Sequence, residues 1–209
     1  MLKNTYKKIN KSKLVYLLFI FTLLMTVSGC YFTNTPGKLQ GIYDQFGLNF
    51  PKDKQVYLAH NIWYTDSMDI SFLNYQQGKI LPFGTKIKFI EAYPDYVIFK
   101  TMSDNKEFKI SNDLQYSLIT NEDLFHKIFT ATNPATKIKN LSNEIITKLK
   151  QGKIETGMTR EEVLLSLGRP PYRMTPPGMK TTWIYYINNK LKTNHIVFKG
   201  NKVTYVFTN

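Results

Sequence analysis

Cysteine, histidine and acidic residues are all scarce in this 209-residue chain. Cys30 is its only cysteine, so no internal disulfide can form. The three histidines, His60, His126 and His195, lie far apart, and none has a second histidine or an acidic residue at metal-ligand spacing. The chain also lacks a nucleophile-elbow pattern. We therefore expect no metal, no cofactor and no enzymatic activity. An envelope hydrolase stays a third hypothesis, without a candidate catalytic residue.

A hydrophobic run long enough to cross a bilayer comfortably is missing as well. The longest mostly apolar run, Leu14–Val27, has the length of a signal-peptide core, and lysines without acidic residues precede it. It ends in Val27-Ser28-Gly29-Cys30, which resembles the lipobox of bacterial lipoprotein precursors. That resemblance implies a signal peptide over residues 1–29, cleavage between Gly29 and Cys30, and lipidation of Cys30. Several acyl chains would anchor the protein stably to a membrane.

The charge balance is basic but contains no long run of like charges. Lysine and arginine number 28 against 15 acidic residues, which gives a net charge of +13. An exported lipoprotein is not expected to meet nucleic acid, so we exclude that partner. The balance instead favours solubility and attraction to anionic headgroups, polysaccharide phosphates or an acidic partner surface.

Residues 30–38 read as a tether, and residues 39–132 as a β-rich domain. A short helix is expected near residues 39–46, because Leu39, Ile42, Tyr43 and Phe46 follow helical spacing. Strand signals then follow at Gln55–His60, Asp69–Tyr75, Lys86–Tyr93, Tyr96–Thr101 and Glu107–Ile110. A helix over Asn121–Ala131 and a linker over residues 133–140 complete this part. The spacing suggests a small barrel or rolled sheet, and Leu81–Thr85 is similar to the opening turn of bacterial SH3-like barrels.

Residues 157–170 specify one helix together with both of its ends. Thr159 is the expected N-cap, and Glu162 completes a capping box with it. Gly168 can adopt the left-handed conformation that ends a helix, and Pro170 prevents its continuation. A second helix is expected before it, from Ser142 to about Gln151.

The end of the chain predicts an ααβββ domain over residues 141–209. Its expected strands are Thr181–Asn188, Lys192–Lys199 and Lys202–Thr208, joined by short turns. In the last strand Val203, Tyr205 and Phe207 alternate with Thr204, Val206 and Thr208. The predicted fold class is therefore α+β: a β-rich N-terminal domain, then a helix pair on one face of a three-stranded antiparallel meander.

This C-terminal part resembles the SmpA/OmlA (BamE-like) family of small outer-membrane lipoproteins. The resemblance rests on Lys-Ile-x-x-Gly-Met-Thr at Lys153–Thr159, Glu162-Val163, Leu-Gly-x-Pro at Leu167–Pro170 and Thr-Thr-Trp-Ile-Tyr-Tyr at Thr181–Tyr186. It implies the ααβββ fold, a periplasm-facing outer-membrane location, and work with a membrane complex that assembles β-barrel proteins or maintains the envelope. Contact with acidic phospholipid is also implied. Tyr31, rather than aspartate, after Cys30 agrees with sorting to the outer membrane. The chain departs from the family in the long segment between Cys30 and the helix pair.

Two binding hypotheses name candidate residues. In the first, a lipid-anchored accessory protein docks on envelope proteins through apolar residues of the proline-rich loop 169–179 and the first C-terminal strand. Its candidates are Tyr172, Met174, Met179 and Trp183, with burial in the core as the alternative for Trp183. In the second, the N-terminal domain binds cell wall or polysaccharide through aromatic rings. Its candidates are Trp63, Tyr64 and Tyr75, for which burial in the barrel is the alternative.

Overall fold

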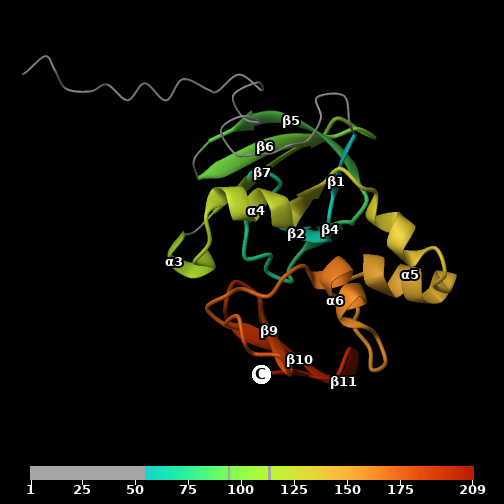
Figure 1. Cartoon of the computed structure of the whole chain (residues 1–209). Coiled ribbons are helices and arrows are strands. Elements are labelled where there is room, and N and C mark those ends of the chain that lie inside the picture. The colour runs from blue at the N-terminus through green and yellow to red at the C-terminus, as the bar shows by residue number, and fades with distance from the viewer. Residues whose placement is uncertain (1–54, 94, 113) are drawn as a thin grey trace, which may run out of the picture. The chain divides into compact units, whose positions relative to one another are not determined.

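The structure is a computed structural model that describes residues 55–93, 95–112 and 114–209. The expected signal peptide, the lipidation site Cys30, the tether and the helix near residues 39–46 lie outside the described residues. All described residues belong to one compact unit of the chain. They form a mixed α and β structure with a curled six-stranded sheet, a three-stranded antiparallel sheet, a small two-stranded sheet and several helices (Figure 1). The coarse α+β class is thus confirmed.

The curled sheet has the strand order β3-β7-β6-β5-β1-β8. Its strands are β1 (Val56–Leu58), β3 (Ile70–Ser71), β5 (Lys86–Ala92), β6 (Tyr96–Thr101), β7 (Glu107–Ser111) and β8 (Phe129–Thr130). All neighbours pair antiparallel except β3 and β7. A bulge between Phe89 and Glu91 interrupts the register of β5 with β6. Bulges increase local twist, so this one helps the sheet to curl.

Aromatic side chains fill the concave side of this sheet. Phe89 and Phe99 each meet Phe129 edge-on, with ring centroids 4.8 and 5.4 Å apart. Helix α4 (Asn121–Ile128) closes the sheet by burying Leu124 and Phe125 in the same cluster. Such rings each bury a large apolar area, so they can stabilise a small core without disulfides.

Helix α4 is shorter than the sequence predicted. Thr120 caps it by accepting a hydrogen bond from the Asp123 backbone N–H at 3.2 Å. The expected end near Ala131 is wrong, because Phe129–Thr130 leaves the helix and pairs with β1 as β8. The buried pairing of Leu58 with Phe129 decides this. A short helix that was not predicted, α3 (Leu114–Ser117), lies before α4.

The two predicted C-terminal helices are present as α5 (Asn143–Lys150) and α6 (Arg160–Leu167). The capping box of α6 is confirmed in both halves. Thr159 Oγ1 accepts from the Glu162 N–H at 3.2 Å, and Glu162 Oε2 accepts from the Thr159 N–H at 2.7 Å. Gly168 ends α6 with φ of +76°, a conformation that L side chains rarely adopt.

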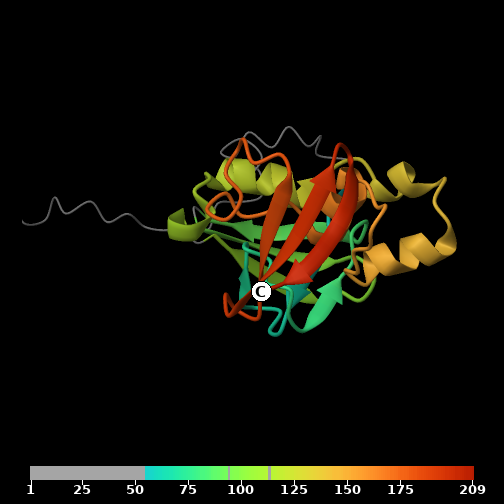
Figure 2. The same cartoon turned by 90° about the horizontal axis from the view of Figure 1, so that it is seen from below.

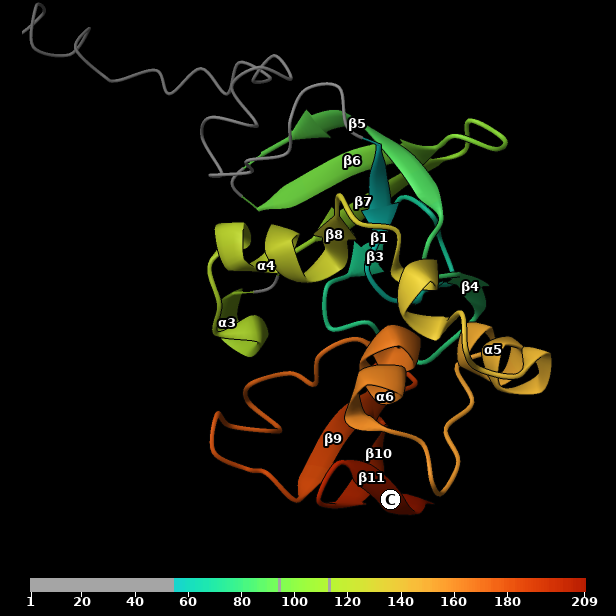
Figure 3. The same cartoon turned by 45° about the vertical axis from the view of Figure 1, so that its right-hand side comes forward.

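The three C-terminal strands form a meander, called here the C-terminal sheet, with the order β11-β10-β9. The strands are β9 (Thr182–Ile187), β10 (Lys192–Lys199) and β11 (Lys202–Thr208), as the sequence predicted to within one residue at each end. Helix α6 packs on one face of this sheet (Figure 3). There Val163 and Leu167 join Tyr185, Ile196 and Phe198 in a second hydrophobic core.

The second core also receives side chains from the N-terminal half. Trp63 lies in strand β2 (Ile62–Tyr64), which pairs with β4 (Lys79–Leu81); neither strand was predicted. Trp63 and Phe83 pack with Leu149 of α5 in this core. Residues 133–140, predicted as a linker, contain a 3-10 helix, η1 (Pro134–Ile138), whose Ile138 is buried in the same core. The two predicted domains therefore share packed residues.

Two buried asparagines connect the halves by hydrogen bonds. Asn61 donates its side-chain amide to the Leu149 carbonyl at 2.7 Å and accepts from the Phe83 N–H at 3.0 Å. Asn74 donates to the Leu167 carbonyl at 3.2 Å. Both carbonyls belong to helix ends, where the last turn leaves acceptors without intrahelical partners. The N-terminal half thus caps the C-termini of α5 and α6.

Candidate interaction surface

The face of the C-terminal sheet opposite α6 carries apolar and aromatic side chains. Strand register places Ile184 opposite His195, and His195 opposite Phe207. Val197 pairs with Tyr205 in the next row on this side. Paired residues share one face of a sheet. We call these five side chains the outer face. Figure 2 shows the three strands from this side with no described helix over them.

A β-bulge decides which residues of β11 reach the outer face. The register shifts between Val197 and Phe198, so that Val203 pairs with Phe198 while Tyr205 pairs with Val197. Thr204 is the extra residue, and its hydroxyl donates to the Val197 carbonyl at 3.2 Å. Val203 is buried, whereas Tyr205 is 62% exposed. The bulge thus places Val203 and Tyr205 on opposite faces of the sheet, although alternation alone would put them on the same face.

The aromatic rings of the outer face contact one another. His195 stacks on Phe207 with ring centroids 4.5 Å apart and an angle of 20° between the planes. Tyr205 tilts against Phe207 at 5.6 Å. The Thr193 hydroxyl lies 2.9 Å from His195 Nε2 and orients the imidazole. Phe207 is 38% exposed although its neighbours cover part of it. This partly exposed aromatic cluster resembles the aromatic anchors of protein interfaces.

The residues that border the outer face are basic, and the two edges of the C-terminal sheet are partly covered. Lys199 pairs with Lys202 beside the Val197–Tyr205 row, and both are exposed. At the β11 edge, Val203 exchanges two backbone hydrogen bonds of 2.8 Å with Gly157 and Met158. At the β9 edge, the Ile184 N–H donates to the Thr175 hydroxyl at 2.8 Å. These contacts disfavour strand addition at the covered parts of both edges.

The four predicted partner-binding residues do not form a single surface. Tyr172 is half-buried against the first core and accepts a hydrogen bond from Lys127 at 3.2 Å. Met174 is half-buried, and Met179 is 41% exposed in the proline-rich loop. The prediction that Trp183 binds a partner is corrected. Strand register places Trp183 beside Ile196 on the inner face, where it meets Phe198 edge-on at 4.7 Å. Its alternative interpretation as a core residue is therefore the better one.

The three predicted platform residues are also separated by the fold. The prediction that Trp63 binds a ligand is corrected, because only 8% of Trp63 is exposed and a Cβ on Gly152 would lie 2.1 Å from its ring. A ring packed so closely has no free face for a sugar. Tyr64 is half-buried and meets Phe108 edge-on at 5.2 Å. Tyr75 alone lines an open groove, described next.

A polar groove of about 480 Å³ surrounds Tyr75. Its other lining side chains are mainly hydroxyls, amides and one carboxylate, contributed by Thr65, Asp69, Ser71, Gln77, Ser111 and Asn189 among others. The Tyr75 ring meets Tyr186 edge-on at 6.2 Å. An aromatic ring beside hydroxyl, amide and carboxylate groups is the chemistry that carbohydrate ligands need. The sequence identified Tyr75 but not the polar residues, which come from segments far apart in the chain.

Three candidate interaction residues, His195, Tyr205 and Phe207, were missed by sequence reasoning. The alternating pattern of β11 grouped Val203 with Tyr205 and Phe207, and only the bulge separates them. An Ile-Val-Phe sequence in β10, apolar on both faces, was the signal that the second face also matters.

The histidines are not gathered into a metal site. No group of three potential metal ligands occurs within the described part of the chain. His60 is buried, with Nδ1 2.8 Å from the Asn61 carbonyl, and its burial lowers its pKa to about 4. Among the helices of residues 55–209 that are described, none is long and apolar enough to cross a membrane.

Comparison of the chain with protein-family models, with curated proteins and with solved structures gave no match.

Proposed function

We propose that this protein is a lipid-anchored envelope accessory protein that acts by binding other proteins, in outer-membrane protein assembly or envelope integrity. Acylated Cys30 would hold it at the outer membrane, facing the periplasm. The sequence of elements α5, α6, β9, β10 and β11 supports the finer interpretation of the C-terminal part as a BamE-like ααβββ domain. The curled sheet supports, more weakly, an SH3-like N-terminal part.

The outer face is the observation that carries this proposal. Tyr205 and Phe207 present exposed rings in an ordered cluster, with Lys199 and Lys202 at its border. The fitting partner is a folded envelope protein with an apolar centre and an acidic rim, because charge complementarity steers association and apolar contact supplies affinity. Lipid anchoring would raise the effective concentration of this surface near membrane-embedded partners.

Site-specific photocrosslinking in intact cells tests the proposal. A photoreactive phenylalanine analogue replaces Tyr205, and a matched probe replaces Met102, which is 49% exposed in the β6–β7 turn. We expect the probe at residue 205 to capture outer-membrane assembly or envelope-integrity proteins, identified by mass spectrometry, and the probe at residue 102 to capture none of them.

A charge-reversal variant sharpens the result. Lys199→Glu with Lys202→Glu should abolish the crosslink from residue 205, because both lysines border the outer face. The proposal fails if both probes capture the same proteins equally, or if residue 205 captures nothing while the protein is folded and membrane-bound.

A second candidate function is binding of cell-wall glycan in the polar groove, which Tyr75 and its hydroxyl and amide neighbours favour. Because the two halves share a core, the test uses the full chain rather than a fragment. Purified sacculi should retain the protein, Tyr75→Ala should lose retention, and Tyr205→Ala should keep it. Equal retention of all three proteins rules out the polar groove as the glycan site.

A further inference from the structure

A second groove, of about 290 Å³, is lined by residues of α4, η1 and α6 and shares none with the polar groove around Tyr75. We call it the cationic groove. Lys127 comes from α4, Lys137 from η1, and Arg169 directly follows the C-cap of α6. Glu161 is the one carboxylate among its described lining residues. Its volume is near the lower end of the range of about 300–1,000 Å³ for small-molecule pockets.

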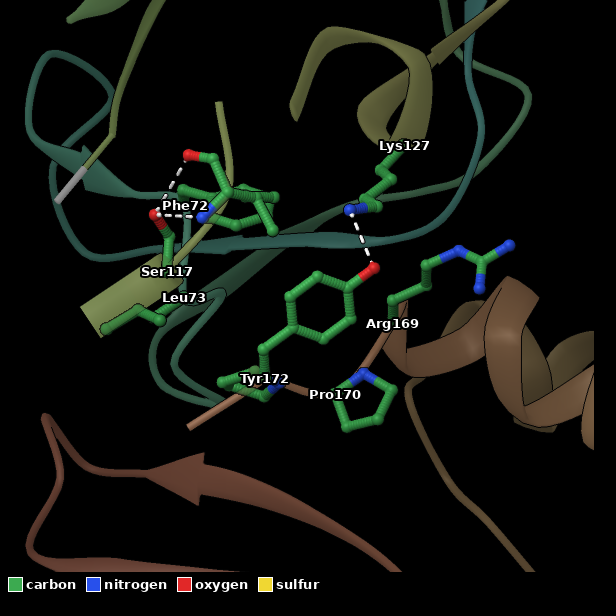
Figure 4. A pocket seen from close by; sticks show the side chains of 9 residues that line it. Phe72, Leu73, Ser117, Lys127, Arg169, Pro170 and Tyr172 are labelled. Atoms are coloured by element: carbon green, nitrogen blue, oxygen red, sulfur yellow. Dashed lines mark hydrogen bonds between the residues drawn. The ribbon is translucent and has the colours of Figure 1, made fainter. Parts of the chain in front are cut away.

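The cations of this groove retain donors for a ligand. Lys127 Nζ donates to the Tyr172 hydroxyl at 3.2 Å, and an ammonium group has two further donors. Figure 4 shows this contact, and the Arg169 guanidinium pointing away from the Tyr172 ring. Arg169 has no ion pair among the described residues, so its planar group of five donors is available to an anion.

Lys137 is the third cation, and its existing partner holds it weakly. Its Nζ lies 3.0 Å from Glu161 Oε1, and both side chains are more than half exposed. Exposed ion pairs of this kind contribute little to stability. A multiply charged anion in the groove can therefore displace Glu161 from Lys137 at little cost.

The buried imidazole of His60 also lines the groove. It is 6% exposed, and Nδ1 is 2.8 Å from the Asn61 carbonyl oxygen. A carbonyl only accepts, so Nδ1 carries the proton, and Nε2 of the neutral ring is an acceptor. Nε2 has no hydrogen-bond partner among the described residues. Burial, with a smaller contribution from Arg169, lowers the pKa of His60 to about 4, so the ring is neutral at pH 7.

A ligand that satisfies all these groups has an anionic end and a hydroxyl end. The cations bind the anion, while the neutral His60 Nε2 accepts a hydrogen bond, which a hydroxyl group of the ligand can donate. We propose that the cationic groove binds a phosphorylated polyol, with the phosphate held by Lys127, Lys137 and Arg169 and a hydroxyl donated to His60. This site does not rest on the docking function, since it shares no residue with the outer face.

Sugar phosphates, glycerol phosphate and the phosphoglycerol headgroup of a lipid all carry this chemistry. Calorimetry on the full chain in detergent uses glycerol 3-phosphate, glucose 6-phosphate, inorganic phosphate and glycerol as probes. Flotation with vesicles of phosphatidylglycerol, against vesicles of phosphatidylcholine, tests the lipid source. We expect saturable binding of the phosphorylated polyols, weaker binding of inorganic phosphate, and none of glycerol. Binding to phosphatidylglycerol vesicles without binding of soluble polyol phosphates assigns the groove to the headgroup.

Matched charge variants separate the groove from the general positive charge. Lys137→Gln with Arg169→Gln should weaken binding at least about tenfold, since each removes a charge-assisted hydrogen bond. Lys139→Gln with Lys150→Gln removes the same charge from exposed positions outside the groove and should change affinity less than about twofold. Equal losses in the two double variants would overturn the proposal, as would the absence of saturable binding to every phosphate probe and vesicle.

The contribution of His60 to ligand binding is tested on the native chain, because replacing this residue would also change the lining of the groove. In the native chain labelled with ¹⁵N-histidine, glycerol 3-phosphate should shift the Nε2 resonance of His60, and inorganic phosphate should shift it less. An unmoved His60 resonance, together with equal affinity for inorganic phosphate and polyol phosphates, would contradict the assignment of a polyol ligand.

Discussion

Val203 and Tyr205 are two residues apart on one strand, yet they lie on opposite faces of the C-terminal sheet. The bulge at Thr204 causes this, because it adds one residue to β11 between them. Val203 therefore enters the second core, and Tyr205 stands in the outer face. A strand without the bulge would place both side chains on the same face of the sheet. The outer face exists because of this single inserted residue.

Substitutions at these two positions should consequently differ in stability. Val203→Ala removes buried methyl groups and should lower the free energy of unfolding by about 1–2 kcal/mol. Tyr205→Ala, at a 62% exposed position, should change it by less than about 0.5 kcal/mol. Urea unfolding followed by circular dichroism measures both. Similar losses for the two variants would mean that β11 has no bulge.

Asn61 should be among the most sensitive polar positions. Asn61→Ala leaves the Phe83 N–H without its acceptor and takes one donor from the Leu149 carbonyl, at a cost of about 1–3 kcal/mol. Ser166 also donates to that carbonyl, at 3.1 Å. A double-mutant cycle with Ser166→Ala should therefore show coupling between Asn61 and Ser166. Asn201→Ala, in the exposed β10–β11 turn, is the control, and strictly additive losses would contradict the shared acceptor.

His60 should make stability depend on pH between about 4 and 6.5. Burial lowers its folded pKa from 6.5 to about 4, so the unfolded chain binds a proton first as pH falls. The stabilisation is fully present above pH 6.5 and is lost as pH falls towards 4, by about 3 kcal/mol. The measurement is the unfolding free energy at pH 7 and pH 4 for the native chain and for His60→Gln. Between pH 7 and pH 4 the unfolding free energy of the native chain should fall by about 3 kcal/mol more than that of the variant. Equal falls in the two proteins would show that His60 has an unshifted pKa.

Gly168 should tolerate substitution less well than Gly157. Both have positive φ, at +76° and +93°. A Cβ on Gly168 would lie 2.8 Å from the His60 ring, whereas nothing lies within 4 Å of one on Gly157. Gly157→Ala should cost about 1 kcal/mol from backbone strain alone, and Gly168→Ala should cost clearly more. Thermal unfolding compares them, and equal melting temperatures would show that His60 moves aside freely.

Cys30 should determine membrane attachment. Cys30→Ser removes the thiol that the lipidation hypothesis requires, so labelled palmitate should no longer enter the protein, and the precursor should keep its leader. Mass spectrometry of the native and variant proteins measures both. Palmitate labelling that persists in the variant, or cleavage of its leader at the native position, would contradict lipid anchoring.

The sequence by itself determined the elements whose signals are local. Thr159, Glu162 and Gly168 set both ends of α6. The turns at residues 188–190 and 200–201 set the two C-terminal hairpins, because caps and tight turns involve only nearby backbone groups. The alternation of β5 and β6 likewise predicted the centre of the curled sheet. Tyr75 was identified as a ligand candidate, though without the groove around it.

Only the tertiary structure decided the rest. Phe129 could continue a helix or join a strand. It ends α4 and pairs with Leu58 of β1 instead. Trp63 is buried because Gly152, far away in sequence, leaves room for its ring. The outer face depends on a bulge, and the cationic groove depends on bringing Lys127, Lys137 and Arg169 together. Such outcomes depend on contacts between distant segments, whose energies a local pattern does not contain.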